Sequence, residues 1–106
     1  FPAQQEFHVL SLNRAHAPLA RHQMFKGGLT GTVTDVRLIL KRALHWNATA
    51  IIVAHNHPSG SLQPSENDKR MTRKLSAAAD TLDIKLLDHL IVAGSGYFSF
   101  SDQGLL

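Results

Sequence analysis

The sequence predicts an α/β fold in which helices flank a single mixed β-sheet. Two segments carry apolar residues at helical three-and-four spacing, and five shorter segments have the β-branched or alternating patterns typical of strands. They follow one another as strand, strand, helix, strand, helix, strand, strand, an order that suits one sheet covered by helices. With 106 residues, 43% of them apolar and 18% charged, the chain can form one compact domain with one core.

The N-terminal quarter of the chain predicts two strands. Glu6 to Leu12 places apolar groups on both alternating faces, as in a strand that is covered on two sides. After a polar break, Leu19 to Phe25 can return beside the first strand before Gly27 and Gly28 punctuate the chain. We therefore expect a hairpin here.

Two amphipathic segments predict helices. The first can be capped by Thr34 or Asp35 and can stop at Asn47. The second is expected from about Glu66 to Ala79. The residues expected to face the core are Val36, Ile39, Leu40 and Ala43 in the first helix, and Met71, Leu75, Ala78 and Ala79 in the second.

Three further strands complete the predicted sheet. Ala48 to Ala54 is a short apolar run rich in Ile and Val, typical of a buried strand, and it leads directly to His55. Ile84 to Ala93 is predicted as another strand, and a glycine-containing turn joins it to a last one from Tyr97 to Phe100. The chain has no internal repeat.

Composition limits the chemistry and the expected location of the protein. The chain has no cysteine, so a bound metal would need nitrogen and oxygen donors, and a reducing, cytoplasmic location is expected. The longest apolar stretch is far shorter than the roughly 20 residues of a membrane span, and no segment resembles a signal peptide. The net charge of +3 is a weak indication of acidic partners.

The stretch from His55 to Asp68 carries the residues best suited to chemistry. Because side chains two apart on a strand point to the same side, His55 and His57 can present two imidazoles to one ion. Ser65 lies where a helix N-cap is expected, so Asp68 can return to the histidines from the first helical turn. Two histidines and one carboxylate leave a fourth tetrahedral position for water, which is the arrangement of a catalytic zinc site.

Two simpler interpretations explain the same residues without a metal. Ser65 and Asp68 have the spacing of a capping box variant, which satisfies free amide groups and the helix dipole. A His-x-His pair also arises by chance in a chain with seven histidines. The conjunction of a strand exit, a turn-rich loop and a carboxylate at the next helix start favours the metal site.

The chain resembles a known family at these positions. The JAMM metal motif of MPN-domain metallopeptidases, His-x-His-x7-Ser-x2-Asp, is matched by His55, His57, Ser65 and Asp68. The surrounding sequence, Ile51 to Gly60 and later Leu87 to Val92, is similar to the bacterial RadC family in particular. The resemblance covers essentially all 106 residues and implies the three-layer MPN architecture, which is similar to that of cytidine deaminases.

The resemblance also implies the extent of the domain. RadC-like proteins generally carry a helical region before this domain. Because the chain starts at Phe1 rather than at a methionine, we expect a single JAMM/MPN domain over residues 1–106 that lacks such a region.

The family implies a role for each site residue. His55, His57 and Asp68 would bind Zn²⁺. Ser65 would hold the polarised substrate oxygen, and a glutamate from the first strand, which only Glu6 matches, would activate water. The hypothesis is therefore a zinc metallopeptidase or isopeptidase-like amide hydrolase that acts on an unknown peptide or protein substrate.

Other interpretations stay open. The family name refers to DNA repair and one helix is basic, so a DNA-associated module is an alternative, with DNA contacts more readily made by the missing N-terminal region. A metal-stabilised scaffold without turnover is another. Asp88 and His89 can form a pair that orients a metal ligand, although we favour His89 as a packed strand residue.

Overall fold

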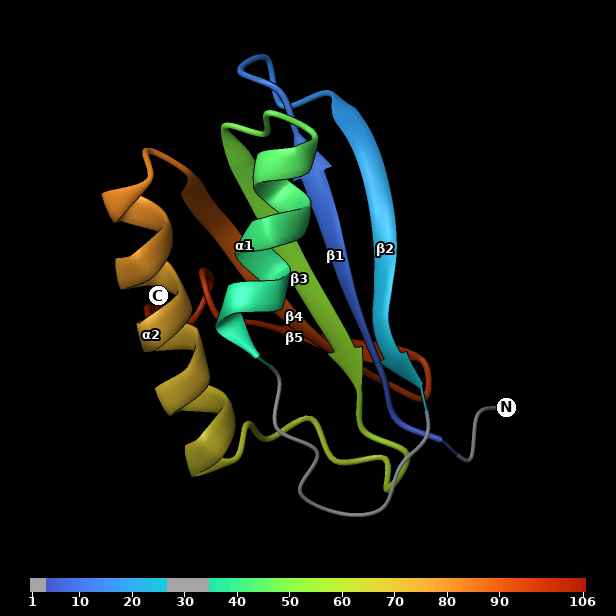
Figure 1. The fold of residues 1–106 in the computed structure, drawn as a ribbon. Helices are drawn as coiled ribbons and strands as arrows, with labels where there is room; N and C mark the ends of the chain where they lie inside the picture. The colour runs from blue at the N-terminus through green and yellow to red at the C-terminus, as the bar shows by residue number, and fades with distance from the viewer. Residues whose placement is uncertain (1–3, 27–34) are drawn as a thin grey trace.

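The strands form one mixed sheet in the computed structural model, which describes residues 4–26 and 35–106 (Figure 1). The strands are β1 (Glu6–Leu12), β2 (Pro18–Lys26), β3 (Ala50–Asn56), β4 (Lys85–Ala93) and β5 (Gly96–Ser99), in the spatial order β2-β1-β3-β4-β5. β3 and β4 run parallel, and the other neighbouring pairs are antiparallel. The predicted α/β fold with a single mixed sheet is confirmed, as is the hairpin of β1 and β2.

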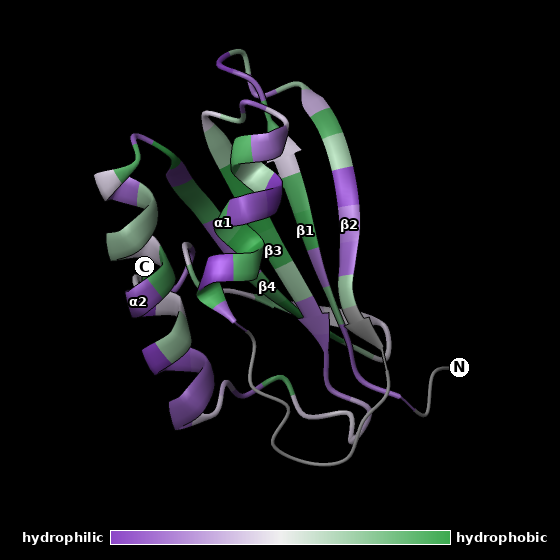
Figure 2. Ribbon diagram, viewed as in Figure 1, coloured by the Kyte–Doolittle hydropathy of each residue, from purple (hydrophilic) through white to green (hydrophobic). Residues whose placement is uncertain are grey.

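Two helices, α1 (Val36–His45) and α2 (Glu66–Thr81), pack against one face of this sheet (Figure 1). Successive strand residues point to opposite faces, so every second side chain of β1 and β3 enters the core beneath the helices. Figure 2 shows the apolar residues concentrated along the central strands behind α1. The central buried side chains are Phe7, Val9, Val36, Ile39, Leu40, Ala43, Ile51, Val53, Leu75 and Ala79.

The ends of α1 follow the signals in the sequence. The Asp35 carboxylate caps the helix by accepting a hydrogen bond from the Arg37 amide at 2.9 Å. The other candidate cap, Thr34, and the glycine pair at 27–28 lie outside the described residues. The helix ends two residues before Asn47, which adopts a φ of 53°. Asparagine tolerates this left-handed conformation, so it suits the position where the helix stops.

The carboxyl end of β3 positions the residues expected to carry chemistry. The strand starts two residues later than predicted and continues through His55 and Asn56, because its pairing with β1 and β4 extends that far. His55 lies between Phe7 of β1 and Ile91 of β4. The chain then reaches α2 and returns to the parallel strand β4, and sites in such α/β crossovers form at the carboxyl ends of the strands.

The described residues build a sheet layer and one helix layer, and the third layer of the expected architecture does not lie among them. The face of the sheet away from the helices carries half-buried aliphatic side chains, among them Leu10, Ile52 and Leu90.

In residues 4–26 and 35–106, neither helix is long and apolar enough to cross a membrane.

Candidate metal centre

Two histidines and one aspartate converge where β3 ends. His55 lies in the last part of β3, His57 directly follows the strand, and Asp68 lies in the first turn of α2. One donor atom from each residue lies within 4.8 Å of the others. The two histidine Nε2 atoms are 3.0 Å apart, and oxygens of Asp68 lie 3.6 Å and 3.4 Å from them. The structure thus brings together the three residues that the sequence predicts as metal ligands.

A capping box holds the Asp68 carboxylate in place. The Asp68 amide donates to the Ser65 hydroxyl at 3.0 Å, and the Ser65 amide donates to Asp68 Oδ2 at 2.9 Å. The carboxylate still has lone pairs that face His55 and His57. The capping interpretation is therefore confirmed, and it is compatible with the metal interpretation because one carboxylate serves both purposes.

A tight turn after β3 holds His57. Its Nδ1 lies 2.9 Å from the Ser61 carbonyl oxygen, and its own carbonyl accepts a hydrogen bond from the Gly60 amide at 3.0 Å. Gly60 has a φ of 91°, a conformation that side chains other than glycine rarely adopt. The turn therefore leaves Nε2 of His57 directed at His55 and Asp68.

A buried network lies behind His55. The His55 Nδ1 is 2.8 Å from Nε2 of His89, and Nδ1 of His89 is 2.6 Å from the hydroxyl of Thr72. The Thr72 hydroxyl also lies 2.6 Å from the Asp68 carbonyl oxygen. The prediction that His89 is a packed strand residue holds for its burial, but its ring also contacts a candidate ligand. Sequence reasoning missed Thr72, whose only signal was a polar residue on the inner side of α2.

The Asp88 carboxylate binds backbone and hydroxyl groups and does not contact the ring of His89. It accepts hydrogen bonds from the His89 amide at 2.7 Å, the Ser99 hydroxyl at 2.6 Å and the Ser101 amide at 3.0 Å. These bonds tie β4 to the end of β5. Asp88 therefore stabilises the edge of the sheet, and the alternative in which Asp88 and His89 pair through the ring to orient a ligand is not formed.

Burial and neighbouring charges set the protonation states at the centre. Burial alone would raise the pKa of Asp68, but interactions with His55 and with the Ser65 amide outweigh it and hold the pKa well below the usual range. Burial, together with the nearby His55, lowers the pKa of His89 to about 3. At neutral pH Asp68 is therefore ionised, and the buried imidazole of His89 is neutral.

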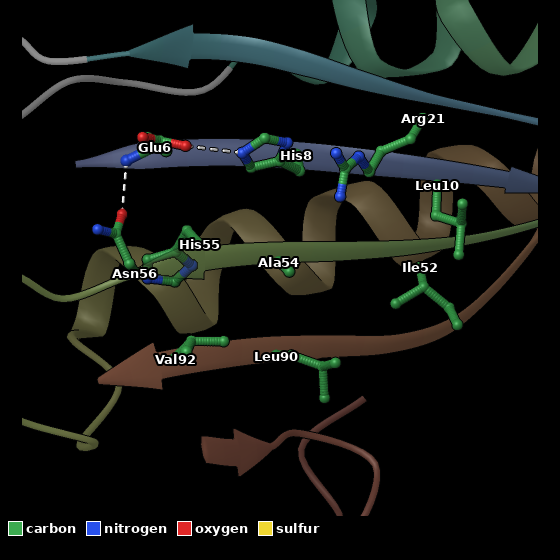
Figure 3. A pocket seen from close by; sticks show the side chains of 10 residues that line it. All are labelled: Glu6, His8, Leu10, Arg21, Ile52, Ala54, His55, Asn56, Leu90 and Val92. Atoms are coloured by element: carbon green, nitrogen blue, oxygen red, sulfur yellow. Dashed lines mark hydrogen bonds and ion pairs between the residues drawn. The ribbon is translucent and has the colours of Figure 1, made fainter. Parts of the chain in front are cut away.

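The predicted base, Glu6, starts β1 at the edge of the same region. Its carboxylate lies 3.0 Å from Nε2 of His8 rather than within the group of three donors, and its amide donates to the Asn56 side chain at 2.6 Å. Figure 3 shows these residues toward one end of a pocket, with Arg21, Leu10 and Ile52 toward the other. The pocket has a volume of about 370 Å³. His55 and Glu6 both line this pocket.

The donor set fits a transition metal ion. Two imidazole nitrogens and one carboxylate oxygen are ligands that zinc accepts in four-coordinate sites. Imidazole also suits copper, iron and nickel, so the three donors form a candidate centre for this group of metals. The two Nε2 atoms are 3.0 Å apart, which is close enough for both to bind one ion.

A mixed α/β sheet that presents such a group at a strand exit fits a hydrolase-like metal module. Residues 2–105 match the family described as RadC-like JAB domain. The chain belongs to this family, which confirms the resemblance carried by the His-x-His stretch.

Curated relatives extend beyond this domain. A UPF0758 protein of Flavobacterium johnsoniae is 48% identical over 101 residues, which are 95% of this chain and 44% of that protein. A UPF0758 protein of Porphyromonas gingivalis is 46% identical over 104 residues, 97% of this chain and 46% of that protein. UPF0758 protein YfjY of Escherichia coli is 44% identical over 103 residues, 97% and 64% respectively. The chain thus spans about half the length of the first two relatives.

Proposed function

We propose that this domain is a zinc-dependent hydrolase that cleaves an amide bond in a peptide or protein substrate. The observation that carries the proposal is the convergence of two imidazole nitrogens and one carboxylate oxygen at the exit of β3. Three protein ligands leave a further position for water or substrate, as in catalytic rather than structural zinc sites. Membership of the RadC-like JAB family supports the same class of chemistry.

In this proposal His55, His57 and Asp68 hold the ion. Zinc held by these residues would supply Lewis acidity and would lower the pKa of water to about 7. The capping box orients the carboxylate and the Ser61 carbonyl orients His57, so little conformational freedom is lost when the ion binds.

Glu6 is proposed as the base that takes the proton of the attacking water and passes it to the leaving amine. Its side chain is 30% exposed, and within residues 4–26 and 35–106 its carboxylate contacts His8, so packing leaves it free to change rotamer. Glu6 lies beside the carboxyl end of β3, where its amide donates to the Asn56 side chain, and this position supports the assignment.

Ser65 is proposed to stabilise the oxyanion that develops on the substrate carbonyl. Its hydroxyl oxygen accepts the Asp68 amide hydrogen, so the hydroxyl hydrogen is free to be donated to substrate. A single donor of this kind is worth about 3 kcal/mol of transition-state stabilisation.

The proposal is tested first by metal content. The purified protein is loaded with zinc, dialysed and measured by mass spectrometry, beside the double variant His55→Ala/His57→Ala. We expect about one zinc per chain, with loss in this variant. The matched control changes two exposed histidines, His16→Asn and His45→Ala, and should keep the metal.

The alternatives predict other results. A protein that takes up no zinc contradicts the proposal. Zinc uptake without turnover on broad peptide libraries supports the metal-stabilised scaffold instead. Salt-dependent DNA binding that a chelator leaves unchanged supports the DNA-associated module.

A further inference from the structure

We propose that His89 and Thr72 are positioning residues that fix the tautomer and the ring orientation of His55, so that its Nε2 lone pair faces the metal. This inference rests on the metal centre of the proposed function. It concerns two residues outside the group of three donors, one on β4 and one on α2. The positions of the hydrogens in the buried network lead to this inference.

The first hydrogen of the network belongs to the Thr72 hydroxyl. The Thr72 hydroxyl lies 2.6 Å from the Asp68 carbonyl oxygen, and a carbonyl can only accept, so the single hydroxyl hydrogen points there. The Thr72 oxygen also lies 2.6 Å from Nδ1 of His89. Because its hydrogen is already used, Thr72 accepts in this second contact, and His89 carries its hydrogen on Nδ1.

The contacts of His89 determine which ring nitrogen of His55 carries a hydrogen. His89 is fully buried, and among the described residues its ring nitrogens contact only Thr72 and His55. Without a carboxylate on the ring, a buried imidazole stays neutral and carries one hydrogen. Nε2 of His89 is therefore an acceptor, and His55 donates to it from Nδ1 at 2.8 Å. In the neutral His55 ring, Nε2 is then left without a hydrogen, as the nitrogen of a metal ligand must be.

His57, on the other side of the centre, also carries its hydrogen on Nδ1. Its Nδ1 donates to the Ser61 carbonyl oxygen at 2.9 Å, so in the neutral ring its Nε2 also lacks a hydrogen. Two Nε2 lone pairs then face each other at 3.0 Å beside the Asp68 carboxylate. This arrangement attracts a cation, and the network behind His55 maintains it.

Packing makes the network rigid. The His89 ring stacks on Phe100 with centroids 4.5 Å apart and an interplanar angle of 8°, and it meets Phe7 edge-on at 6.0 Å. Thr72 is fully buried one turn after Asp68 in α2. The network thus connects the backbone of one ligand to the ring of another, which couples the position of α2 to that of β3.

The test uses three variants of the 106-residue chain and two measurements. His89→Phe keeps the ring packing and removes both nitrogens. Thr72→Val keeps the shape and removes the hydroxyl, whereas Thr72→Ser restores the hydroxyl. Long-range ¹H–¹⁵N NMR of the metal-free protein at mildly alkaline pH reports the tautomer of His55. Competition with a chromophoric chelator reports the Kd for zinc.

We expect wild-type His55 to be protonated at Nδ1 alone. In His89→Phe and Thr72→Val, His55 should become a mixture of tautomers and the Kd for zinc should rise about 10- to 100-fold, the usual cost of losing an outer partner of a ligand. Thr72→Ser should resemble the wild type. A core variant, Leu86→Ala, controls for stability, because it creates a cavity away from His55 and should leave both measurements unchanged.

An unchanged tautomer and an unchanged Kd in His89→Phe and Thr72→Val would overturn the inference. If His89→Phe does not fold, Thr72→Val and Thr72→Ser decide the question. If the wild type binds no zinc, the proposed function fails, but the NMR measurement needs no metal and still decides whether the network sets the tautomer.

Discussion

At the scale of single residues, His55 is where β3, α2 and the candidate metal chemistry meet. It is only 3% exposed, and its ring stacks on Phe7 with centroids 5.9 Å apart. A buried imidazole needs partners for both nitrogens. Nδ1 has His89, and Nε2 faces His57 and Asp68. An imidazole nitrogen and a carboxylate both face Nε2 of His55, so this buried position suits a cation, either a metal ion or a proton.

The role of Glu6 can be tested with a substitution that removes only its basicity. Glu6→Gln should keep the zinc content of the wild type, since Glu6 is not among the three donors, and should lower turnover by about 100-fold or more. Steady-state kinetics and metal analysis of the same sample measure both effects. His8→Gln serves as the control and should stay active; full activity in Glu6→Gln would exclude Glu6 as the base.

His89 predicts how stability depends on pH. Burial lowers its pKa from 6.5 to about 3, so below pH 6.5 the unfolded chain takes up a proton that the folded chain refuses. The metal-free protein should therefore lose stability as the pH falls below 6.5, by up to about 1.4 kcal/mol per pH unit. This loss ends where folded His89 protonates, near pH 3.

Urea unfolding at several pH values above about 5, where most carboxylates remain ionised, measures this slope. His89→Phe has no proton to take up at this position, so its slope should be shallower. Equal slopes in the two proteins would show that another group causes the acid sensitivity.

The candidate ligands could be predicted from the sequence because they are local. His55 and His57 are two apart at a strand end, and Asp68 is three residues beyond an N-cap, so strand and helix geometry favour their convergence, and the family resemblance points to the same three residues. The contact between Thr72 and His89 could not be predicted in this way. It joins two residues 17 apart in the chain and depends on how α2 docks on β4.

At the scale of elements, the first turn of α2 has two functions. The capping box starts the helix and the same carboxylate faces the histidines. The fold and the site therefore depend on the same residues, Ser65 and Asp68. Substitutions that keep the cap but change its chemistry can separate these functions.

Ser65 offers such a separation. Ser65→Ala should lower the free energy of unfolding by about 1 kcal/mol through loss of the cap and should lower turnover by about 100-fold through loss of the oxyanion donor. Ser65→Gly costs only a few tenths of a kcal/mol in stability, yet it also lacks the hydroxyl. Denaturant unfolding and kinetics on both variants should show low turnover in each but marked destabilisation only in Ser65→Ala. Normal turnover in Ser65→Gly would assign Ser65 to capping alone.

Boundaries of elements were predictable where local signals decide them. Asn47 marks the end of α1 because its left-handed conformation stops the helix. The end of β3 could not be predicted in this way. Its last two residues, His55 and Asn56, are polar and extend the strand only through their pairing with β1 and β4. Pairing of this kind depends on the whole sheet, and a local pattern does not contain it.

At the scale of the whole molecule, the metal centre joins the two layers of the fold. β3 supplies His55, the loop after it supplies His57, and α2 supplies Asp68. A bound ion would therefore cross-link the sheet to a helix that also closes the core through Leu75 and Ala79. Such an ion binds the folded chain and not the unfolded one, so its binding free energy adds to the stability of the entire domain.

Zinc should accordingly raise the melting temperature of the wild-type protein. At a free zinc concentration of about 100 times the Kd, the folded state gains about 2.7 kcal/mol, which corresponds to a rise on the order of 10 °C for a domain of this size. Calorimetry with and without a chelator measures the shift. Asp68→Asn can keep the capping hydrogen bond but loses the charge, so its melting temperature should respond little to zinc. Glu66→Gln, an exposed acid of the same helical turn, should respond like the wild type, because Glu66 contacts Lys69 instead of the histidines. Equal shifts in wild type and Asp68→Asn would mean that zinc stabilises the fold from some other position.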